Sequence, residues 1–210
     1  ATNAMGTGPF KITLREPNTK TVFKRNKKWW GTMKDNKVTE IHLLPIKNAA
    51  TRVAALLSGE IDVVTDAPVQ DLARIKNSPA HKVESTAQMR TIFLGMDQGA
   101  DKLRTGNTGD NPFKKKAVRQ ALYQAIDIEA IKKKVMRGLS EPAGIITFPG
   151  VNGYTEELDK RLPYDVAAAK KLLADAGYPN GFEVELRCPN DRYVNDEAIC
   201  TAVVGMLGKI

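Results

Sequence analysis

The residues best suited to chemistry lie in one polar loop, at positions 189–195 (PNDRYVN). Arg192 offers a planar guanidinium that can pair with a carboxylate through two hydrogen bonds, and Tyr193 offers a hydroxyl and a ring. The loop follows a predicted strand and precedes a predicted helix, whose free backbone N–H groups favour an anion. We therefore predict a ligand-binding site made of Arg192, Tyr193 and Asn190.

An ordinary surface loop explains the same residues equally well. In that interpretation Arg192 forms a salt bridge with Asp191 or Asp196, which lie one and four residues away in the sequence. The residues alone leave both interpretations open.

No catalytic constellation accompanies the loop. The motifs GxSxG, HExxH and GxxxxGK[ST] are absent from the sequence. Capping and turn formation explain carboxylate pairs such as Asp62 and Asp66. His42 and His81 are isolated and form no zinc-ligand spacing with the cysteines. The sequence predicts no enzyme, no catalytic residue, no metal site and no cofactor.

The two cysteines, Cys188 and Cys200, flank the loop and the start of the next helix. This spacing permits a disulfide, which would require an oxidising compartment. The residues do not decide between a disulfide and free thiols, and two buried thiols are the favoured interpretation.

The chain is basic, with 32 lysines and arginines against 24 acidic residues and a net charge of +8. This balance favours acidic partners or anionic surfaces. The lysine runs at 114–116 and 132–134 contain no interleaved aromatic or arginine residues, unlike many nucleic-acid-binding surfaces. Three consecutive helical positions point in three directions, which indicates solvated faces. A nucleic-acid-binding module and an enzyme of unknown class are kept as the alternatives.

Hydrophobic periodicity predicts strands and helices in alternation. Strand, helix and strand at 38–64 predict a βαβ unit with a parallel strand pair. The predicted strands are 10–14, 21–23, 38–44, 61–64, one near 83, 91–96 and 182–186. The first two are predicted to form a β-hairpin, with its turn at Pro17-Asn18. The predicted helices are 50–57, 69–76, 118–126, 128–135, 166–176 and 199–210, with caps at Asn48, Asp127 and Asp165.

An ordered series of segments resembles a known family. The segments are GTGPF at 6–10, RNKKWWG at 25–31, TRVAALLSGEIDVV at 51–64, RTIFLGMD at 90–97, PFKKKAVRQALYQAID at 112–127 and YDVAAAKKLLADAGYPNGF at 164–182. In this order they are similar to the extracellular solute-binding proteins of ABC importers for dipeptides, oligopeptides and nickel.

The resemblance implies an α/β fold of the periplasmic-binding-protein-like (type II) kind, with a ligand cleft between two lobes that close about a hinge. It also implies that the chain is a fragment. Residues 1–5 are expected to be a non-native extension. Residues 6–110 are expected to form part of the first lobe, with the βαβ unit and a hinge strand. Residues 111–210 are expected to begin a second lobe that is truncated at the C-terminus.

The implied function is that of a substrate-binding component. The protein would capture small peptides or similar solutes and deliver them to an ABC permease in the membrane, without binding nucleic acid. Its location would be periplasmic, or extracellular and membrane-associated. Arg192 matches the arginine that clamps the peptide carboxylate in dipeptide binders. Tyr193 follows it directly, where that pattern has an intervening proline. The aspartate that holds the peptide amino group would lie beyond Ile210, so the fragment alone is expected to bind ligand weakly or not at all.

Overall fold

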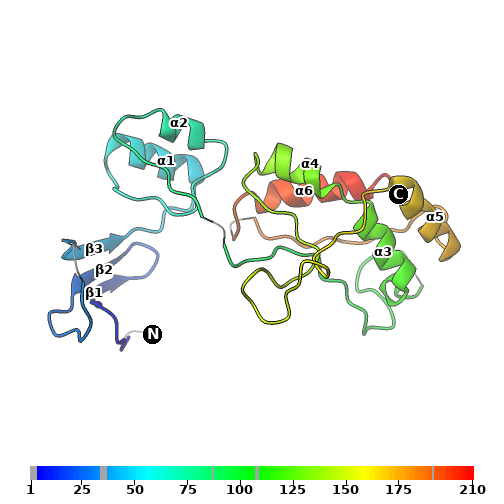
Figure 1. The fold of residues 1–210 in the computed structure, drawn as a ribbon, viewed down its shortest axis with the longest axis horizontal. Coiled ribbons are helices and arrows are strands. Elements are labelled where there is room, and N and C mark those ends of the chain that lie inside the picture. The colour runs from blue at the N-terminus through cyan, green and yellow to red at the C-terminus, as the bar shows by residue number, and fades with distance from the viewer. Residues whose placement is uncertain (1–3, 34–36, 87, 107–108, 191) are drawn as a thin grey trace. The chain divides into compact units, whose positions relative to one another are not determined.

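The computed structural model describes residues 4–33, 37–86, 88–106, 109–190 and 192–210. The chain divides into two compact units, residues 1–62 and residues 63–210 (Figure 1). The predicted lobe boundary between residues 110 and 111 concerns the whole protein and stays a prediction. Of the predicted extension at 1–5, residues 1–3 lie outside the described part.

The first unit contains an antiparallel sheet of β1 (Phe10–Glu16), β2 (Lys20–Arg25) and β3 (Glu40–Leu43), in the order β1-β2-β3. Asn18 adopts a φ of 62° in the turn between β1 and β2, as asparagine does readily. The register pairs Phe10 with Arg25 and Glu16 with Lys20, and shifts between Ile12 and Leu14. The predicted hairpin is confirmed.

Helix α1 (Ala49–Ser58) also belongs to the first unit. The side-chain oxygen of Asn48 accepts the backbone N–H of Thr51 at 2.9 Å, which satisfies a free donor of the first turn. Gly59 ends the helix with a φ of 79°, a conformation that costs glycine little. Val53 and Leu56 are buried. The helix predicted at 50–57 and its cap at Asn48 are confirmed, with one more residue at each end.

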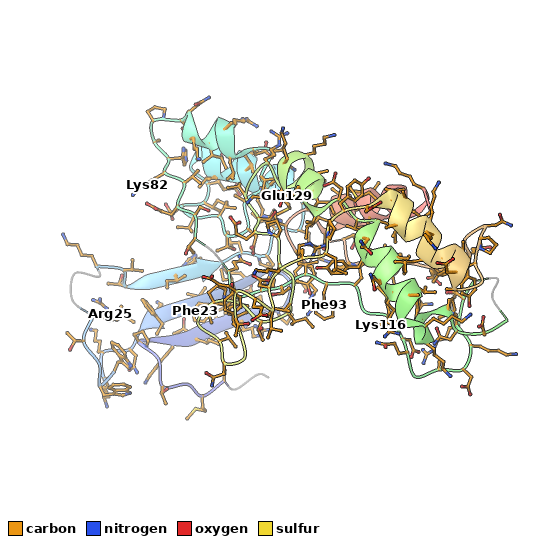
Figure 2. The ribbon with its side chains drawn as sticks, turned by 45° about the vertical axis from the view of Figure 1, so that its right-hand side comes forward. Phe23, Arg25, Lys82, Phe93, Lys116 and Glu129 are labelled. Atoms are coloured by element: carbon orange, nitrogen blue, oxygen red, sulfur yellow. A yellow bond between two sulfur atoms is a disulfide. The ribbon has the colours of Figure 1, made fainter. Side chains whose placement is uncertain are left out.

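The predicted βαβ unit is wrong. Strand β3 pairs antiparallel with β2, and residues 61–64 form no strand. The segments around 83, at 91–96 and at 182–186 are likewise not strands, so the predicted hinge strand is not formed either. A strand exists through its ladder of hydrogen bonds, and within the described ranges none of these segments has such a ladder. Val63 and Phe93 are accordingly 76% and 62% exposed, and Phe93 lies on an irregular stretch of chain (Figure 2).

Among the described residues of the second unit, the regular elements are all helices, joined by long irregular segments. α4 continues directly into a short π-helix, η2, and Glu129 lies on α4 (Figure 2). The helices are α2 (Leu72–Lys76), the 3₁₀ turn η1 (Pro112–Lys114), α3 (Lys116–Gln124), α4 (Ile128–Ala130), η2 (Ile131–Val135), α5 (Val166–Asp175) and α6 (Asp196–Leu207). The helical positions predicted here are confirmed, with ends shifted by up to a turn.

The core of the second unit forms where helices pack against each other. On α3, Val118 and Ala121 are fully buried against Ala169 and Leu173 of α5 (Figure 1). Small residues at the contact let the two helices approach closely. A second cluster joins η2 and the residue that follows it to α6 through Ile131, Met136 and Val203. This cluster supports the loop that leads into α6.

Candidate ligand-binding site

A disulfide joins Cys188, just before the predicted ligand-binding loop, to Cys200 on α6. The two Cα atoms are 6.5 Å apart, within the range that a disulfide spans. The favoured interpretation as two buried thiols is therefore wrong, and Cys188 is also exposed. The bridge fixes the start of the loop to the body of the helix that follows it.

Asp196, the first residue of α6, holds the other end of the loop. Its carboxylate accepts the backbone N–H groups of Arg192 at 2.9 Å and Tyr193 at 3.1 Å through Oδ2, and that of Glu197 at 2.9 Å through Oδ1. Only 6% of Asp196 is exposed. Burial acts to raise the pKa of this carboxyl, but the backbone N–H donors around it outweigh burial and hold the pKa below its usual range. The carboxylate that holds this end of the loop is therefore ionised at neutral pH.

A third contact ties the loop to the neighbouring helices. Asn195 adopts a φ of 58° and its Nδ2 donates to the carbonyl oxygen of Val135, the last residue of η2, at 2.8 Å. Asparagine tolerates this left-handed backbone better than most residues. The contact satisfies a carbonyl at the end of η2, where intrahelical donors run out.

Two arginines meet on one tyrosine ring. The guanidinium carbon of Arg192 lies 5.2 Å from the centre of the Tyr193 ring, and that of Arg90 lies 5.3 Å from the same centre. Both distances are within the range of cation–π attraction. The structure thus brings the predicted residues Arg192 and Tyr193 together and adds Arg90. This contact could not be predicted from the sequence, because Arg90 comes from a segment far away in the chain.

The salt bridge considered for Arg192 is not formed with Asp196. The carboxylate of Asp196 binds the main chain of Arg192, and Asp191 lies outside the described residues. Within the described ranges, neither Arg90 nor Arg192 makes an ion pair through its side chain. Both arginines are exposed at the surface. Their N–H donors are available to a bound anion.

Asn190, the third predicted residue, is exposed beside the disulfide. It lines a shallow depression of about 340 Å³. The other lining residues are Leu186, Cys188, Pro189, Glu197, Cys200, Thr201 and Val204. Arg192 and Tyr193 are not among them, so the depression and the arginine pair are different features of the same loop.

The histidines have local partners. His42 Nε2 lies 2.6 Å from a carboxylate oxygen of Glu40, and His81 Nδ1 lies 2.8 Å from the hydroxyl of Ser78. Across the part of the chain that the structure describes, no three His, Cys, Asp or Glu side chains gather as metal ligands do. In the same part, no helix is both long and apolar enough to cross a membrane.

Comparison with known proteins decides the family. All of residues 1–210 match the model for bacterial extracellular solute-binding proteins, family 5, middle section. The chain belongs to this family. It is 32% identical over 183 residues to heme-binding protein A of Haemophilus influenzae, covering 86% of the chain and 31% of that protein. It is 28% identical over 184 residues to the glutathione-binding protein GsiB of Escherichia coli O1:K1 / APEC, covering 87% of the chain and 33% of that protein.

Solved structures agree with this assignment. NikA from Staphylococcus aureus, in complex with Ni(L-His)2, superposes with a TM-score of 0.74 at 25% identity, over 97% of this chain and 41% of NikA. The periplasmic binding protein AgaA of A. tumefaciens R10, in complex with agropinic acid, gives a TM-score of 0.71 at 31% identity, over 96% of this chain and 39% of AgaA.

These matches confirm the predicted family and the predicted type II periplasmic-binding-protein fold. The chain spans about a third of the length of the curated relatives it matches. The predicted class, a solute-binding protein instead of an enzyme, is confirmed at the level of the family.

Proposed function

We propose that this chain is part of the substrate-binding component of an ABC importer, which captures a small peptide or a similar solute and delivers it to a membrane permease. The proposed location is the periplasm, or the outer face of the cell membrane. Family membership supports the role in solute capture. The named relatives differ in their solutes, which include heme, glutathione and a nickel–histidine complex. The family therefore leaves the solute to be argued from the site.

The observation that carries the peptide proposal is the state of Arg192. Its main chain is fastened to Asp196, while its guanidinium is exposed and makes no ion pair with any described carboxylate. A guanidinium on a fixed loop is pre-organised for a ligand carboxylate, because little conformational entropy is lost on binding. Tyr193 supports the guanidinium through its ring, and Asn190 is proposed to contact more distant parts of the ligand.

The experiment compares two ligands that differ in one group. Isothermal titration calorimetry measures the affinity of the full-length protein, of which this chain is a part, for the dipeptide Ala-Ala and for Ala-Ala amide, which lacks the carboxylate. We expect the acid to bind more tightly, and we expect Arg192→Gln to remove this preference. A charged hydrogen-bonded pair is worth about 1.5–3 kcal/mol, which corresponds to roughly a 10- to 150-fold difference in affinity.

Arg187→Gln is the matched control. Arg187 is exposed just before the same loop, but its Nε pairs with Glu185 at 3.1 Å. This variant removes the same charge and should keep the preference for the acid. Equal binding of acid and amide by the unmodified protein would refute the carboxylate clamp. Native mass spectrometry of the protein purified from periplasmic extract would then identify the solute that is actually retained.

A further inference from the structure

We infer that the ligand carries two anionic groups, with Arg192 holding one carboxylate and Arg90 holding the other. This inference rests on the proposed function and narrows the class of solute. It starts from the two guanidinium groups, which lie 5.2 Å and 5.3 Å from the centre of the same Tyr193 ring.

The two arginines are brought together by the fold and not by the sequence. Arg90 lies on an exposed, irregular stretch, and Arg192 lies on the loop before α6. That stretch is held near the loop because Leu94 and Val194 pack against the same cluster of Ile131, Met136 and Val203. The pairing therefore depends on packed apolar residues and not on the arginines themselves.

No carboxylate in the described part of the chain neutralises the guanidinium groups of Arg90 and Arg192. Two like charges that share one ring repel each other, and neither arginine has an ion pair with a described carboxylate. Asp196 is the carboxylate bound to this loop, and it accepts backbone N–H groups at both of its oxygens. A dianionic ligand would neutralise both cations, whereas a ligand with one carboxylate would leave one of them unneutralised.

Both arginines can contact Tyr193 and still keep their N–H donors available to a ligand. A guanidinium attracted to a ring uses the π face of the ring and keeps its own N–H donors for a planar acceptor such as a carboxylate. The ring itself is partly buried and its backbone N–H is bound to Asp196 at 3.1 Å. Tyr193 is therefore a fixed support that both guanidinium groups share.

Another basic surface of the same unit lacks these features. A depression of about 560 Å³ on α4 and η2 is lined by Glu129, Lys132, Lys133, Arg137 and Gly138. Glu129 contributes a carboxylate to its wall, and Lys132 pairs with Glu141 at 3.0 Å. Part of its positive charge is already neutralised, so the Arg90–Arg192 pair is the better anion site.

The test uses the dipeptides Ala-Glu and Ala-Gln, which have nearly the same shape and differ in one carboxylate. Calorimetry at low salt measures both affinities for the full-length protein, unmodified and with Arg90→Gln, Arg90→Lys or Arg187→Gln. We expect the unmodified protein to prefer Ala-Glu by at least ten-fold. Arg90→Gln should abolish this preference, while Arg90→Lys should keep part of it.

The outcomes separate this inference from the proposed function. If the unmodified protein binds both peptides equally, or if Arg90→Gln keeps the preference, the second anion site is refuted while peptide capture stands. If the unmodified protein binds neither peptide, both proposals fail. Arg187→Gln should behave like the unmodified protein, and a lost preference in this control would mean that overall charge, not Arg90, selects the ligand. Arg90 is exposed, so Arg90→Gln should fold normally. An unchanged midpoint of urea unfolding would show this.

Discussion

Removing the disulfide should destabilise the second unit and loosen the ligand-binding loop. The perturbation is the double variant Cys188→Ser and Cys200→Ser, which replaces the bridge by two small polar side chains. The cysteines are 12 residues apart in the sequence. For a closed loop of this length, the loss of chain entropy in the unfolded state stabilises the folded state by about 3 kcal/mol.

Urea unfolding at neutral pH, followed by circular dichroism, measures the effect. With a slope of roughly 2 kcal/mol per molar urea, the midpoint should fall by about 1.5 M. A reducing agent should lower the midpoint of the unmodified protein by a similar amount. It should leave the double variant unchanged, and this comparison controls for effects of the reductant itself.

The same variant should bind Ala-Ala more weakly, because the bridge fixes the start of the loop that carries Arg192. The contacts of Asp196 and Asn195 remain, so we expect a loss of about ten-fold and not complete loss of binding. Equal midpoints with and without reductant would refute the entropic argument. So would two thiols per molecule that react with a thiol reagent in the native protein, because the bridge would then not exist.

Two further predictions concern single residues. Asp196→Asn should lower the free energy of unfolding by about 1–3 kcal/mol at neutral pH, because a buried carboxylate that accepts three N–H groups is lost; Glu197→Gln, at an exposed neighbour, is the control. The pKa of Asp196 is lower in the folded than in the unfolded chain, so its contribution is complete above about pH 4 and disappears as the pH falls through the folded pKa. Urea midpoints of the unmodified protein and of Asp196→Asn should therefore converge in acid, and a constant gap down to pH 2 would contradict this. Ala169→Leu should lower the free energy of unfolding by about 1–3 kcal/mol, because Ala169 is fully buried where α5 packs against α3. Ala167→Leu, on the exposed face of α5, is the control and should not lower it. Equal thermal midpoints for the two variants would show that the contact tolerates a larger side chain.

The helices could be predicted from the sequence because their determinants are local. Asn48, Asp127 and Asp165 each accept a backbone N–H three residues ahead, at 2.8–2.9 Å. A cap side chain and the backbone N–H that donates to it are separated by a single turn, so the sequence contains the whole interaction. The π-helical turn at Ile131–Val135 was not predicted, because its hydrogen-bond pattern differs from that of an α-helix by one residue, which periodicity does not resolve.

The strands were predicted less well because their partners are remote. The hairpin of β1 and β2 is local and was predicted, with its turn. The segments at 61–64 and 91–96 have the apolar residues of strands, but in the described part of the chain they have no hydrogen-bonded neighbour. β propensity describes how a residue fits a sheet and does not supply the sheet.

The binding site follows the same rule: its local features could be predicted from the sequence, and its contacts between distant segments could not. Arg192 and Tyr193 could be selected from the sequence because a polar loop before a helix is a local feature. Arg90 could not, because its contact with Tyr193 depends on how two distant segments pack on one apolar cluster. The state of Cys188 and Cys200 could not be decided either, since a disulfide depends on the 6.5 Å approach of their Cα atoms and not on their spacing in the sequence.

The fastening of this loop explains why an arginine here differs from an arginine in an ordinary surface loop. In an ordinary loop, a neighbouring carboxylate neutralises the side chain, and a ligand must first displace that partner. Here the carboxylate of Asp196 is occupied by backbone N–H groups, including that of Arg192 itself. The disulfide and the hydrogen bond from Asn195 to Val135 also fix the loop, and neither of them involves the guanidinium of Arg192. The loop is thus held by interactions that do not use its cation, and a ligand carboxylate does not have to displace any carboxylate of the described residues from Arg192.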